Sequence, residues 1–325
     1  MIVLAVDGGN SKTDLALVAA DGALIAHARG PLSSPHHLGL EGCVEVLQRL
    51  VDEAGLDGRR AEVAQVLLAG IDFPDEEERL HGALAQRGWA TSIHVGNDTF
   101  AVLRAGTESG FGIAITCGAG INCVGVGRDG THVRFPALGE ITGDWGGGHD
   151  VGLAGLWAAA RSEDGRGPKT ALEQLVPQHF GYETPLQLAR GFHAGELSRR
   201  RLHEAAPIVL ASSDAVALGI GDRLADEVVA LARAAFTRLG LGDEPVEVLV
   251  GGGLMRFADA RLITRIENGL NTVSPAIALR RTSQPPIVGA ALLGLDALGA
   301  SSAVQERLRT ELSAAVAKLE TVEVG

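Results

Sequence analysis

Asp7-Gly8-Gly9-Asn10-Ser11-Lys12-Thr13-Asp14 is the stretch of this sequence that decides the fold. A β-rich run over residues 2–6 leads into its glycines, and a second run over residues 15–19 leaves it. An Asp-Gly pair at 21–22 marks the next turn. The pattern predicts a β-hairpin whose glycine turn exposes backbone N–H groups, although a single hairpin of this kind is weak evidence for a binding site.

The same design recurs around Gly118. A strand is expected over residues 112–116, the turn Cys117-Gly118-Ala119-Gly120 follows, and a returning strand covers residues 122–126. Two such turns can face each other across a cleft and offer N–H groups to one polyphosphate. The recurrence therefore predicts two half-proteins that share a nucleotide.

Two further segments fit the same interpretation. A buried-looking strand over residues 246–250 ends in Gly251-Gly252-Gly253-Leu254-Met255, where a triple glycine allows a flat ring such as adenine to approach the backbone. Asn97 and Asp98 follow a strand over residues 92–95 and precede a helix over residues 99–105. They should lie at the carboxyl edge of a sheet, where open α/β folds place ligands.

In this order, the segments resemble the phosphate, connecting and adenosine segments of the actin-like superfamily of sugar kinases and ATPases. The closer resemblance is to the N-acetylglucosamine kinase branch of the BadF/BadG/BcrA/BcrD ATPase family, and it covers nearly the whole chain. Its motifs are D-G-G-N-S-K-T-D at Asp7, N-D-T-F-A-V at Asn97, G-A-G-I-N-C at Gly118, G-D-W-G-G-G-H-D-V-G at Gly143 and D-G-R-G-P-K-T-A-L at Asp164.

The resemblance implies an α/β fold of two actin-like (ribonuclease H-like) domains with a nucleotide and sugar cleft between them. We expect the N-terminal domain over residues 1–108 and the C-terminal domain over residues 109–325, an arrangement that allows the C-terminal helices to pack back on the first domain. Residues 106–110 and 283–286 are the candidate hinges. Helices are expected over residues 40–54, 75–87, 151–160, 207–239, 287–298 and 301–318.

The resemblance also implies roles for single residues. Asp98 matches the catalytic base, which accepts the proton of the acceptor hydroxyl, whereas its position before a helix would equally suit an N-cap. Asp7 is expected to order Mg²⁺ through water. Lys12 is either a phosphate contact or a solvated charge. The expected ATP-binding residues are Gly8, Gly9, Asn10, Ser11, Lys12, Thr13, Thr116, Gly118, Ala119, Gly120, Gly252 and Gly253.

For the acceptor, a carboxylate in a glycine loop can accept hydrogen bonds from a pair of sugar hydroxyls, which favours Asp144. Trp145 could stack on a pyranose or pack in the core. Asn122, Glu140 and His36 complete the expected sugar-binding set. The chain departs from the family here, because Ser33-Ser34-Pro35-His36-His37 lacks the family's asparagine. The usual glutamate and serine after Asp144 and the usual G-G-W-G before it are also missing, so the identity of the sugar stays open.

Composition agrees with a two-domain enzyme. The chain has 325 residues, more than one hydrophobic core usually supports. Its net charge of −12 argues against a nucleic-acid partner or an anionic membrane surface. We find no apolar run of membrane length and no signal peptide, so we expect a cytoplasmic protein.

The sequence therefore predicts ATP-dependent phosphorylation of an amino sugar, N-acetylglucosamine or glucosamine, at a primary hydroxyl, by a homodimer that uses ATP and Mg²⁺. A competing hypothesis is an ATPase module that activates a partner enzyme through a shared iron–sulfur cluster. Cys43, Cys117 and Cys123 do not resemble the cysteines of such activators. A kinase of a different hexose and a sugar-binding protein that transfers no phosphate also stay open.

Overall fold

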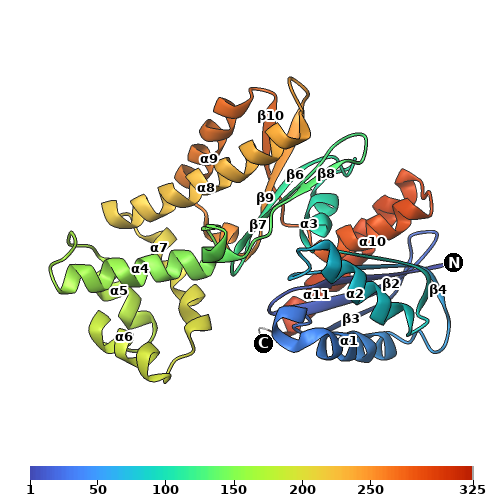
Figure 1. Cartoon of the computed structure of the whole chain (residues 1–325), viewed down its shortest axis with the longest axis horizontal. Helices are drawn as coiled ribbons and strands as arrows, with labels where there is room; N and C mark the ends of the chain where they lie inside the picture. Colours follow the sequence, from blue (N-terminus) through green and yellow to red (C-terminus); the bar gives the residue numbers. More distant parts are fainter. Residues whose placement is uncertain (324–325) are drawn as a thin grey trace. The chain divides into compact units, whose positions relative to one another are not determined.

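Residues 1–323 of the computed structural model are described, and they build two five-stranded mixed sheets with helices packed around them (Figure 1). One compact unit is Met1–Gly112 together with the chain from Thr282 onward, and the other is Ile113–Arg281. The expected boundary lies at residues 108 and 109, with the C-terminal segment assigned to the second domain. The structure groups that segment with the first unit, because its helices cover the first sheet, which the expected arrangement allows.

In the first unit, β1 lies at the centre of the strand order β3-β2-β1-β4-β5. It pairs antiparallel with β2 and parallel with β4, and β4 pairs parallel with β5. The strands are β1 (Ile2–Gly8), β2 (Lys12–Ala19), β3 (Leu24–Pro31), β4 (Ala61–Leu68) and β5 (Ala90–Gly96). The helices are α1 (Pro35–Glu53), α2 (Pro74–Ala85), α3 (Thr99–Gly106), α10 (Pro286–Ala297) and α11 (Ser302–Glu323).

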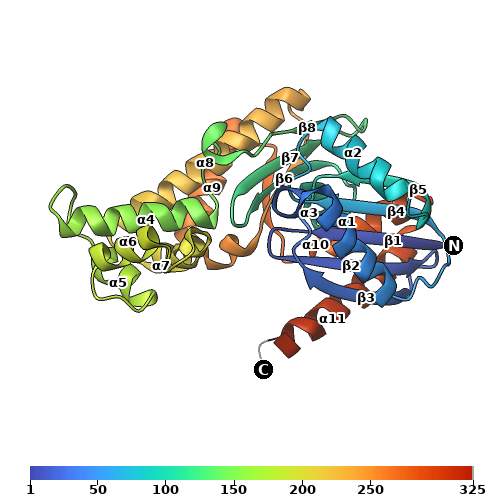
Figure 2. The same cartoon turned by 60° about the horizontal axis from the view of Figure 1, so that its bottom comes forward.

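Alternation along β1 explains why both faces of this sheet are covered. Leu4 and Val6 pack on the face of α1 and α2, whereas Val3 and Ala5 pack on the face of α3, α10 and α11. Figure 2 shows α10 and α11 on the side of the sheet opposite to α1. Helices α10 and α3 approach so closely that a Cβ on Gly289 would lie 1.8 Å from the carbonyl oxygen of Ala101.

The second unit repeats this strand order as β8-β7-β6-β9-β10. Here β6 pairs parallel with β9, β9 pairs parallel with β10, and β7 pairs antiparallel with β8. The strands are β6 (Gly112–Cys117), β7 (Ile121–Val126), β8 (His132–Arg134), β9 (Val246–Gly251) and β10 (Ile277–Arg281). The helices are η1 (Gly139–Ile141), α4 (Gly148–Glu163), α5 (Leu172–His179), α6 (Pro185–Ala194), η2 (Arg199–Ala205), α7 (Ala206–Ala211), α8 (Ala215–Leu239), η3 (Gly253–Phe257) and α9 (Ala260–Val273).

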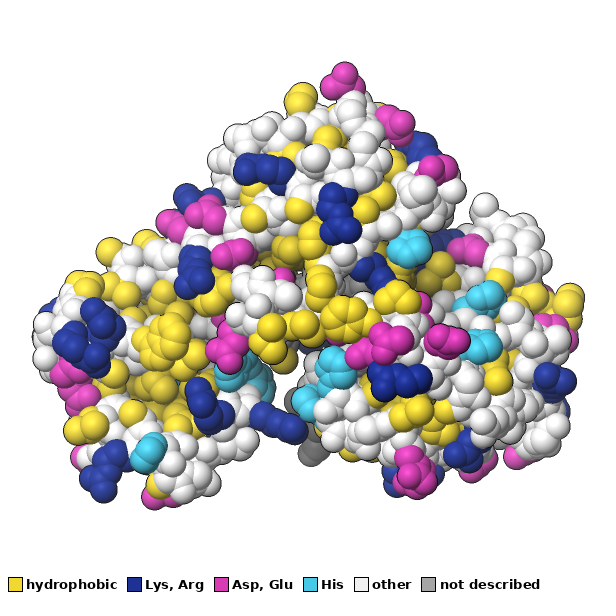
Figure 3. All heavy atoms as spheres, viewed as in Figure 1, with side chains coloured by type: hydrophobic (Ala, Val, Ile, Leu, Met, Phe, Trp, Pro, Cys, Tyr) yellow, Lys and Arg dark blue, Asp and Glu magenta, His cyan; other side chains and the backbone are white. Residues whose placement is uncertain are grey.

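The two sheets therefore share one topology, with the glycine turn in each case between the first and second strands of the sheet. This confirms the predicted α/β fold class and explains the repeated sequence pattern. Between β8 and α8, the second unit carries the helices α4 to α7. Hydrophobic side chains gather over α4 to α6 on the face drawn in Figure 3, and Trp157, Leu175 and Leu186 of these helices are exposed.

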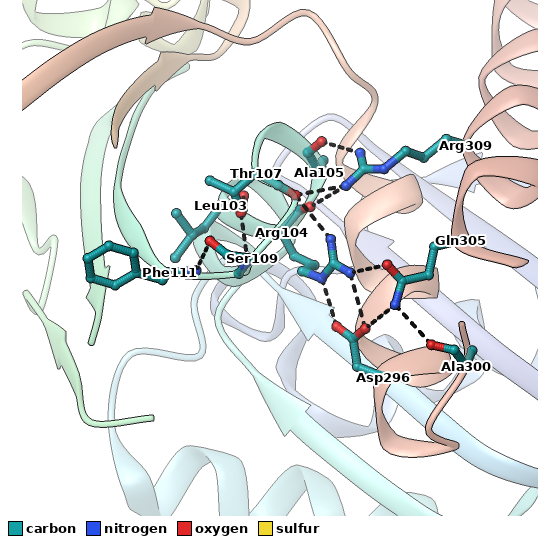
Figure 4. A network of polar contacts seen from close by, with 11 residues as sticks. Leu103, Arg104, Ala105, Thr107, Ser109, Phe111, Asp296, Ala300, Gln305 and Arg309 are labelled. Atoms are coloured by element: carbon teal, nitrogen blue, oxygen red, sulfur yellow. Dashed lines mark hydrogen bonds and ion pairs between the residues drawn. The ribbon is translucent and has the colours of Figure 1, made fainter. Parts of the chain in front are cut away.

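An ionic network around the buried Arg104 fixes the end of α3 in the first unit (Figure 4). The guanidinium of Arg104 donates to both carboxylate oxygens of Asp296 at 2.7 and 3.1 Å, and also to Gln305. Arg309 of α11 donates to the carbonyl oxygens of Ala105 and Thr107. The C-terminal carbonyls of α3 are thus held by the last helix, close to the point where the chain leaves for β6.

No single helix in the described residues is both long and apolar enough to cross a membrane. The segments Arg199–Ala211 and Ala215–Leu239 pass that test only as a pair, and the pair is bent by 110°.

Candidate active site

Three carboxylates lie at the carboxyl edge of the parallel strands of the first sheet. Asp7 lies on β1, Asp72 follows β4, and Asp98 follows β5. Because β1, β4 and β5 run parallel, their carboxyl ends meet at one edge. The charges are close enough for Asp98 to raise the pKa of Asp7 and for Asp72 to raise that of Asp98.

Asp7 and Asp14 occupy directly opposed positions on β1 and β2, yet they differ in charge environment. Burial, together with the charges of Asp98 and Asp14, raises the pKa of Asp7 well above its ordinary value. Burial would also raise the pKa of Asp14, but hydrogen bonds from His27 and Arg29, both at 2.8 Å, hold it below its ordinary value. Lys12 and Arg29 lower the pKa of Asp7 only in part, so Asp7 is the less compensated carboxylate of this pair.

Asp98, the predicted base, does not cap α3 through its side chain. It is the residue before α3, but its side chain makes no capping hydrogen bond to that helix. Burial and the charge of Asp72 raise the pKa of Asp98 to about 7, whereas the N–H groups of Thr99 and of Asp98 itself act in the opposite direction. A carboxyl group with a pKa near 7 can accept a proton effectively at neutral pH.

The first glycine turn has the geometry expected of an exposed backbone loop. The N–H of Gly9 donates to the carbonyl of Lys12 at 2.9 Å, and Asn10 and Ser11 are exposed at its tip. Gly8 is required by packing, since a Cβ there would lie 2.3 Å from the hydroxyl oxygen of Ser33. The Lys12 ammonium is half exposed, 3.5 Å from Glu320 and 3.8 Å from Asp14.

Thr13 is the member of this turn whose side chain points into the protein. Thr13 is fully buried. Its hydroxyl donates to the carbonyl oxygen of Pro31 at 2.7 Å and lies 2.8 Å from the hydroxyl oxygen of Ser33. This hydroxyl therefore ties β2 to the last residue of β3 and to the segment that follows it.

Three glycine segments converge in the second unit. The N–H of Gly148 donates to the carbonyl of Gly118 at 2.8 Å. A Cβ on Gly147 would lie 2.2 Å from the Cα of Gly120, and one on Gly252 would lie 2.4 Å from the carbonyl oxygen of Cys117. Gly252 also has a φ of +95°, which favours glycine. The structure thus brings together the predicted phosphate turn, the Gly143 loop and the end of β9.

The surface of this junction is open at the positions assigned to ATP. A Cβ on Gly118, Gly120 or Gly253 would meet no atom within 4 Å, and Ala119 is exposed. Within the described residues, the hydroxyl oxygen of Thr116 is buried and makes no hydrogen bond. An unpaired buried hydroxyl beside an open glycine turn leaves a polar group available to a ligand.

The predicted acceptor residues of this unit have partners in the structure. Asp144 accepts a hydrogen bond from the Thr142 hydroxyl. The Arg223 guanidinium lies over the Trp145 ring, 4.0 Å from its centroid, so the arginine occupies one face of that ring. The side-chain oxygen of Asn122 accepts the N–H of Cys123 at 2.7 Å, and Glu140 is exposed in η1.

His36 lies at the start of α1, in the first unit. Its ring nitrogen is 3.4 Å from the Glu76 carboxylate, and both residues line a cavity of about 210 Å³. Asp72 and Glu76 are absent from the predicted site. Asp72 follows β4 as Asp98 follows β5, so an acidic residue after a strand is the signal that could have identified it. The acidic run that includes Glu76 is typical of a solvated helix start.

The repeat of one five-stranded sheet, with a glycine turn between the first two strands of each copy, is the fold of the actin-like class of ATPases and sugar kinases. This chain is a member of the BadF/BadG/BcrA/BcrD ATPase family, whose sequence profile matches residues 4–294.

Curated relatives and solved structures agree with this family. The chain is 26 % identical over 261 residues to an N-acetylmuramic acid/N-acetylglucosamine kinase of Clostridium acetobutylicum, covering 78 % of this chain and 85 % of that protein. It is 25 % identical over 327 residues to an N-acetyl-D-glucosamine kinase of Dictyostelium discoideum, covering 91 % and 98 %.

The fold is that of a structure from Chromobacterium violaceum described as a candidate N-acetylglucosamine kinase, with a TM-score of 0.68, 23 % identity, and coverage of 90 % of this chain and 98 % of that one. A ROK family glucokinase from Streptomyces griseus, solved in complex with glucose and AMPPNP, superposes with a TM-score of 0.54 at 16 % identity, covering 92 % and 99 %.

Proposed function

We propose that this protein is an ATP-dependent kinase of an amino sugar, N-acetylglucosamine or glucosamine, and that it phosphorylates a primary hydroxyl. The kinase names of two curated relatives and the ATPase family of the chain support the reaction class. The observation that carries the proposal is Asp98, a carboxylate at the edge of the sheet that is left out of helix capping and has a pKa of about 7.

In this mechanism, the oxygen of the sugar hydroxyl forms a bond to the γ-phosphorus of ATP, and Asp98 accepts the proton of that hydroxyl. The bond between that phosphorus and the bridging oxygen breaks, and ADP leaves with the bonding electrons. Such transfer depends mostly on positioning and on neutralising charge, so one base suffices as the proton acceptor. We assign the polyphosphate to the N–H groups of residues 9–12 and of the turn at 118–120.

Further residues suit the nucleotide. We assign Thr116 a phosphate contact because its buried hydroxyl lacks a protein partner among the described residues. Gly252 and Gly253 are assigned to the adenosine. Thr13 supports the first turn through Pro31, so we attribute its contribution to backbone shape.

The donor set also fits Mg²⁺. Asp7 offers hard carboxylate oxygens. Burial, together with the nearby negative charges, raises its pKa, and a bound cation would offset this cost of ionisation. We propose that Asp7 holds the ion through water. When bound, Mg²⁺ supplies charge neutralisation on the phosphoryl oxygens.

For the sugar, we propose hydrogen bonds from its hydroxyls to Asp144, with Asn122, Glu140, Trp145 and His36 as further contacts. The Arg223 guanidinium covers one face of Trp145, so the stacking role requires the other face. The test is an ADP-release assay with Mg²⁺–ATP across hexoses, hexosamines and N-acetylhexosamines, with a sugar-free control.

We expect the highest kcat/KM with N-acetylglucosamine or glucosamine, and ³¹P NMR of the product should show a phosphate ester on the primary carbon. A phosphate at the anomeric carbon would overturn the assigned hydroxyl. A preference for another hexose would overturn the assigned sugar. Equal ADP release with and without every sugar would overturn the kinase and favour the partner-activating ATPase.

The partner-activating ATPase has its own test. The thiols of Cys43, Cys117 and Cys123 are buried, and burial raises the pKa of both Cys43 and Cys117 to about 12. Such thiols are poor metal ligands because the thiolate is the ligating form. Protein purified without oxygen should therefore be colourless, and stoichiometric iron and sulfide would support the activator.

We further propose a cytoplasmic homodimer. Its cellular compartment follows from the need for ATP, and the exposed Trp157, Leu175 and Leu186 offer apolar surface for a second copy. Light scattering in solution should give twice the chain mass of 33.6 kDa. A monomer mass at micromolar concentration would contradict the dimer.

A further inference from the structure

Asn97, the residue before Asp98, makes hydrogen bonds with both the oxygen and the nitrogen of its side chain. It is 2 % exposed. Its side-chain oxygen accepts hydrogen bonds from the N–H of Thr99 at 3.0 Å and from the Thr99 hydroxyl at 2.6 Å. Its side-chain nitrogen donates to a carboxylate oxygen of Asp72 at 2.8 Å and to the carbonyl oxygen of Ile71 at 3.3 Å. One amide thus links the start of α3 to the segment after β4.

These contacts explain why the neighbouring Asp98 carboxylate does not cap α3. A helix start needs an acceptor for its first N–H groups, and an aspartate before the helix normally supplies it. Here Asn97 supplies that acceptor to Thr99, and the Asp98 side chain makes no cap. The capping function and the proton-accepting function, which the sequence N-D-T could combine in one residue, are divided between two.

We propose that Asn97 is a positioning residue of the reaction, which holds Asp98 at the sheet edge by binding Thr99 on one side and Asp72 on the other. The inference rests on the proposed kinase function. This role requires a side chain that accepts a hydrogen bond from Thr99 and donates one to Asp72. An amide does both, whereas a carboxylate only accepts. An aspartate at position 97 would keep the cap but face Asp72 with a like charge and no donor.

The test exchanges the hydrogen-bond donor and acceptor between positions 97 and 72. Asn97→Asp alone removes the hydrogen bond to Asp72. Asp72→Asn added to it restores a hydrogen bond with donor and acceptor reversed and returns the charge of the pair to that of the wild type. Asp72→Asn alone keeps a possible acceptor for Asn97. The surface variant Asn268→Asp adds the same charge on an exposed part of α9 and serves as the control.

We expect kcat of Asn97→Asp to fall by about 30-fold, because displacing a catalytic group by about 1 Å can cost about 100-fold. The KM values for sugar and ATP should stay within about threefold. The double variant should recover at least about tenfold of the loss, and Asn268→Asp should match the wild type. All rates are measured well below the unfolding midpoint of each variant, so that a lowered stability alone does not change them.

Three outcomes would overturn the inference. They are an unchanged kcat in folded Asn97→Asp, a loss confined to KM, and no recovery in the double variant. Should Asn97→Asp not fold, Asn97→Ser replaces it, since serine keeps an acceptor for Thr99 but lacks the amide donor. Its kcat should fall about tenfold, and Asp72→Asn should not rescue it. Failure of the proposed function is separate, because the wild type would then show no sugar-dependent turnover.

Discussion

Asp7 of β1 lies directly opposite Asp14 of β2, and only Asp14 receives hydrogen bonds from a histidine and an arginine. Two opposed carboxylates on neighbouring strands destabilise a sheet unless their charge is compensated. Arg29 and His27 compensate Asp14, and the pKa of Asp7 is raised instead. The arrangement makes ionisation of Asp7 unfavourable, and a cation such as the Mg²⁺ that we assign to this residue would offset that cost.

Asp7→Asn should therefore stabilise the fold and abolish activity. A carboxyl group with a raised pKa in the folded state stabilises it while protonated, and this contribution is lost as the pH rises above the unfolded value of about 4. The neutral amide removes the cost of ionisation, so the thermal midpoint should increase at pH 8 but not at pH 4. Turnover should fall by about 100-fold or more across a MgCl₂ titration.

The control for Asp7→Asn is Asp75→Asn, an exposed residue at the start of α2. It should leave both the midpoint and the turnover unchanged. A midpoint for Asp7→Asn that is lower than that of the wild type at pH 8 would show that Asp7 has a stabilising partner, contrary to its charge environment here.

Asp98 should determine the acid limb of the pH–rate profile. Its pKa of about 7 means that the base form is lost below neutral pH, so kcat/KM should rise between pH 6 and pH 8 with a midpoint near 7. Asp98→Asn should lower kcat by about 100-fold or more and remove this limb. A wild-type profile that is flat from pH 5 to pH 8, or a variant with near-normal turnover, would contradict the role of Asp98 as base.

Much of the site could be predicted because it follows from local sequence. The strand before Asn97 and the helix after Asp98 place this carboxylate at the sheet edge without knowledge of any long-range contact. The partners of Asp14 could not be found in this way. Arg29 faces Asp14 only through the register of β2 and β3, and a shift of one residue would turn it to the other face.

The helices show the same limit. The sequence predicts one helix over residues 207–239, whereas α7 ends at Ala211 and α8 begins at Ala215. Asp214 breaks the helix there, since its carboxylate accepts the N–H groups of Val216 and Ala217 and caps α8. Helices α5 and α6 escape prediction, because their short apolar stripes are set by packing against α4.

The two glycine positions Gly118 and Gly252 should respond differently to substitution. A Cβ at Gly118 meets open space, so Gly118→Val should fold normally while its side chain enters the region assigned to phosphate. We expect ATP affinity to fall by about tenfold or more, which is at least about 1.4 kcal/mol, with sugar affinity unchanged. Calorimetry showing wild-type ATP binding in folded Gly118→Val would remove ATP from this turn.

Gly252→Ala, in contrast to Gly118→Val, should lower the stability of the fold. Its φ of +95° and the 2.4 Å approach of a Cβ to the carbonyl oxygen of Cys117 predict a loss of about 2 kcal/mol or more in unfolding free energy. Chemical denaturation measures this loss. A stability equal to that of the wild type would mean that the end of β9 relaxes away from Cys117.

Asp296→Ala should destabilise the first unit, because the buried Arg104 would lose the two hydrogen bonds that it donates to Asp296. Loss of one partner of a fully buried pair costs about 3–5 kcal/mol, and the 37 % exposure of the Asp296 side chain reduces this to about 2 kcal/mol. Asp21→Ala breaks an exposed pair with Arg307 and should leave stability unchanged. Equal denaturation midpoints for the two variants would show that the Arg104 network contributes no more than a surface pair.

Asp144 should separate sugar binding from ATP binding. Asp144 is partly exposed, and among the described residues its carboxylate accepts a hydrogen bond from the Thr142 hydroxyl. A carboxylate can accept several hydrogen bonds, so acceptor capacity remains for sugar hydroxyls. Asp144→Ala should weaken sugar binding by about tenfold or more, because a hydrogen bond to a charged group contributes about 1.5–3 kcal/mol. ATP affinity should stay within about twofold of the wild type.

Thr142→Val is the matched control for Asp144→Ala, since it removes the hydroxyl that binds Asp144 while keeping the carboxylate. If the Thr142 contact merely orients the carboxylate, this variant should lose less sugar affinity than Asp144→Ala when both are measured by calorimetry at saturating AMPPNP. An equal loss in both variants would locate the effect in the shape of the Gly143 loop. Unchanged sugar affinity in Asp144→Ala would remove this carboxylate from the acceptor site and leave residues of the first unit, Asp72 and His36 foremost, to bind the sugar.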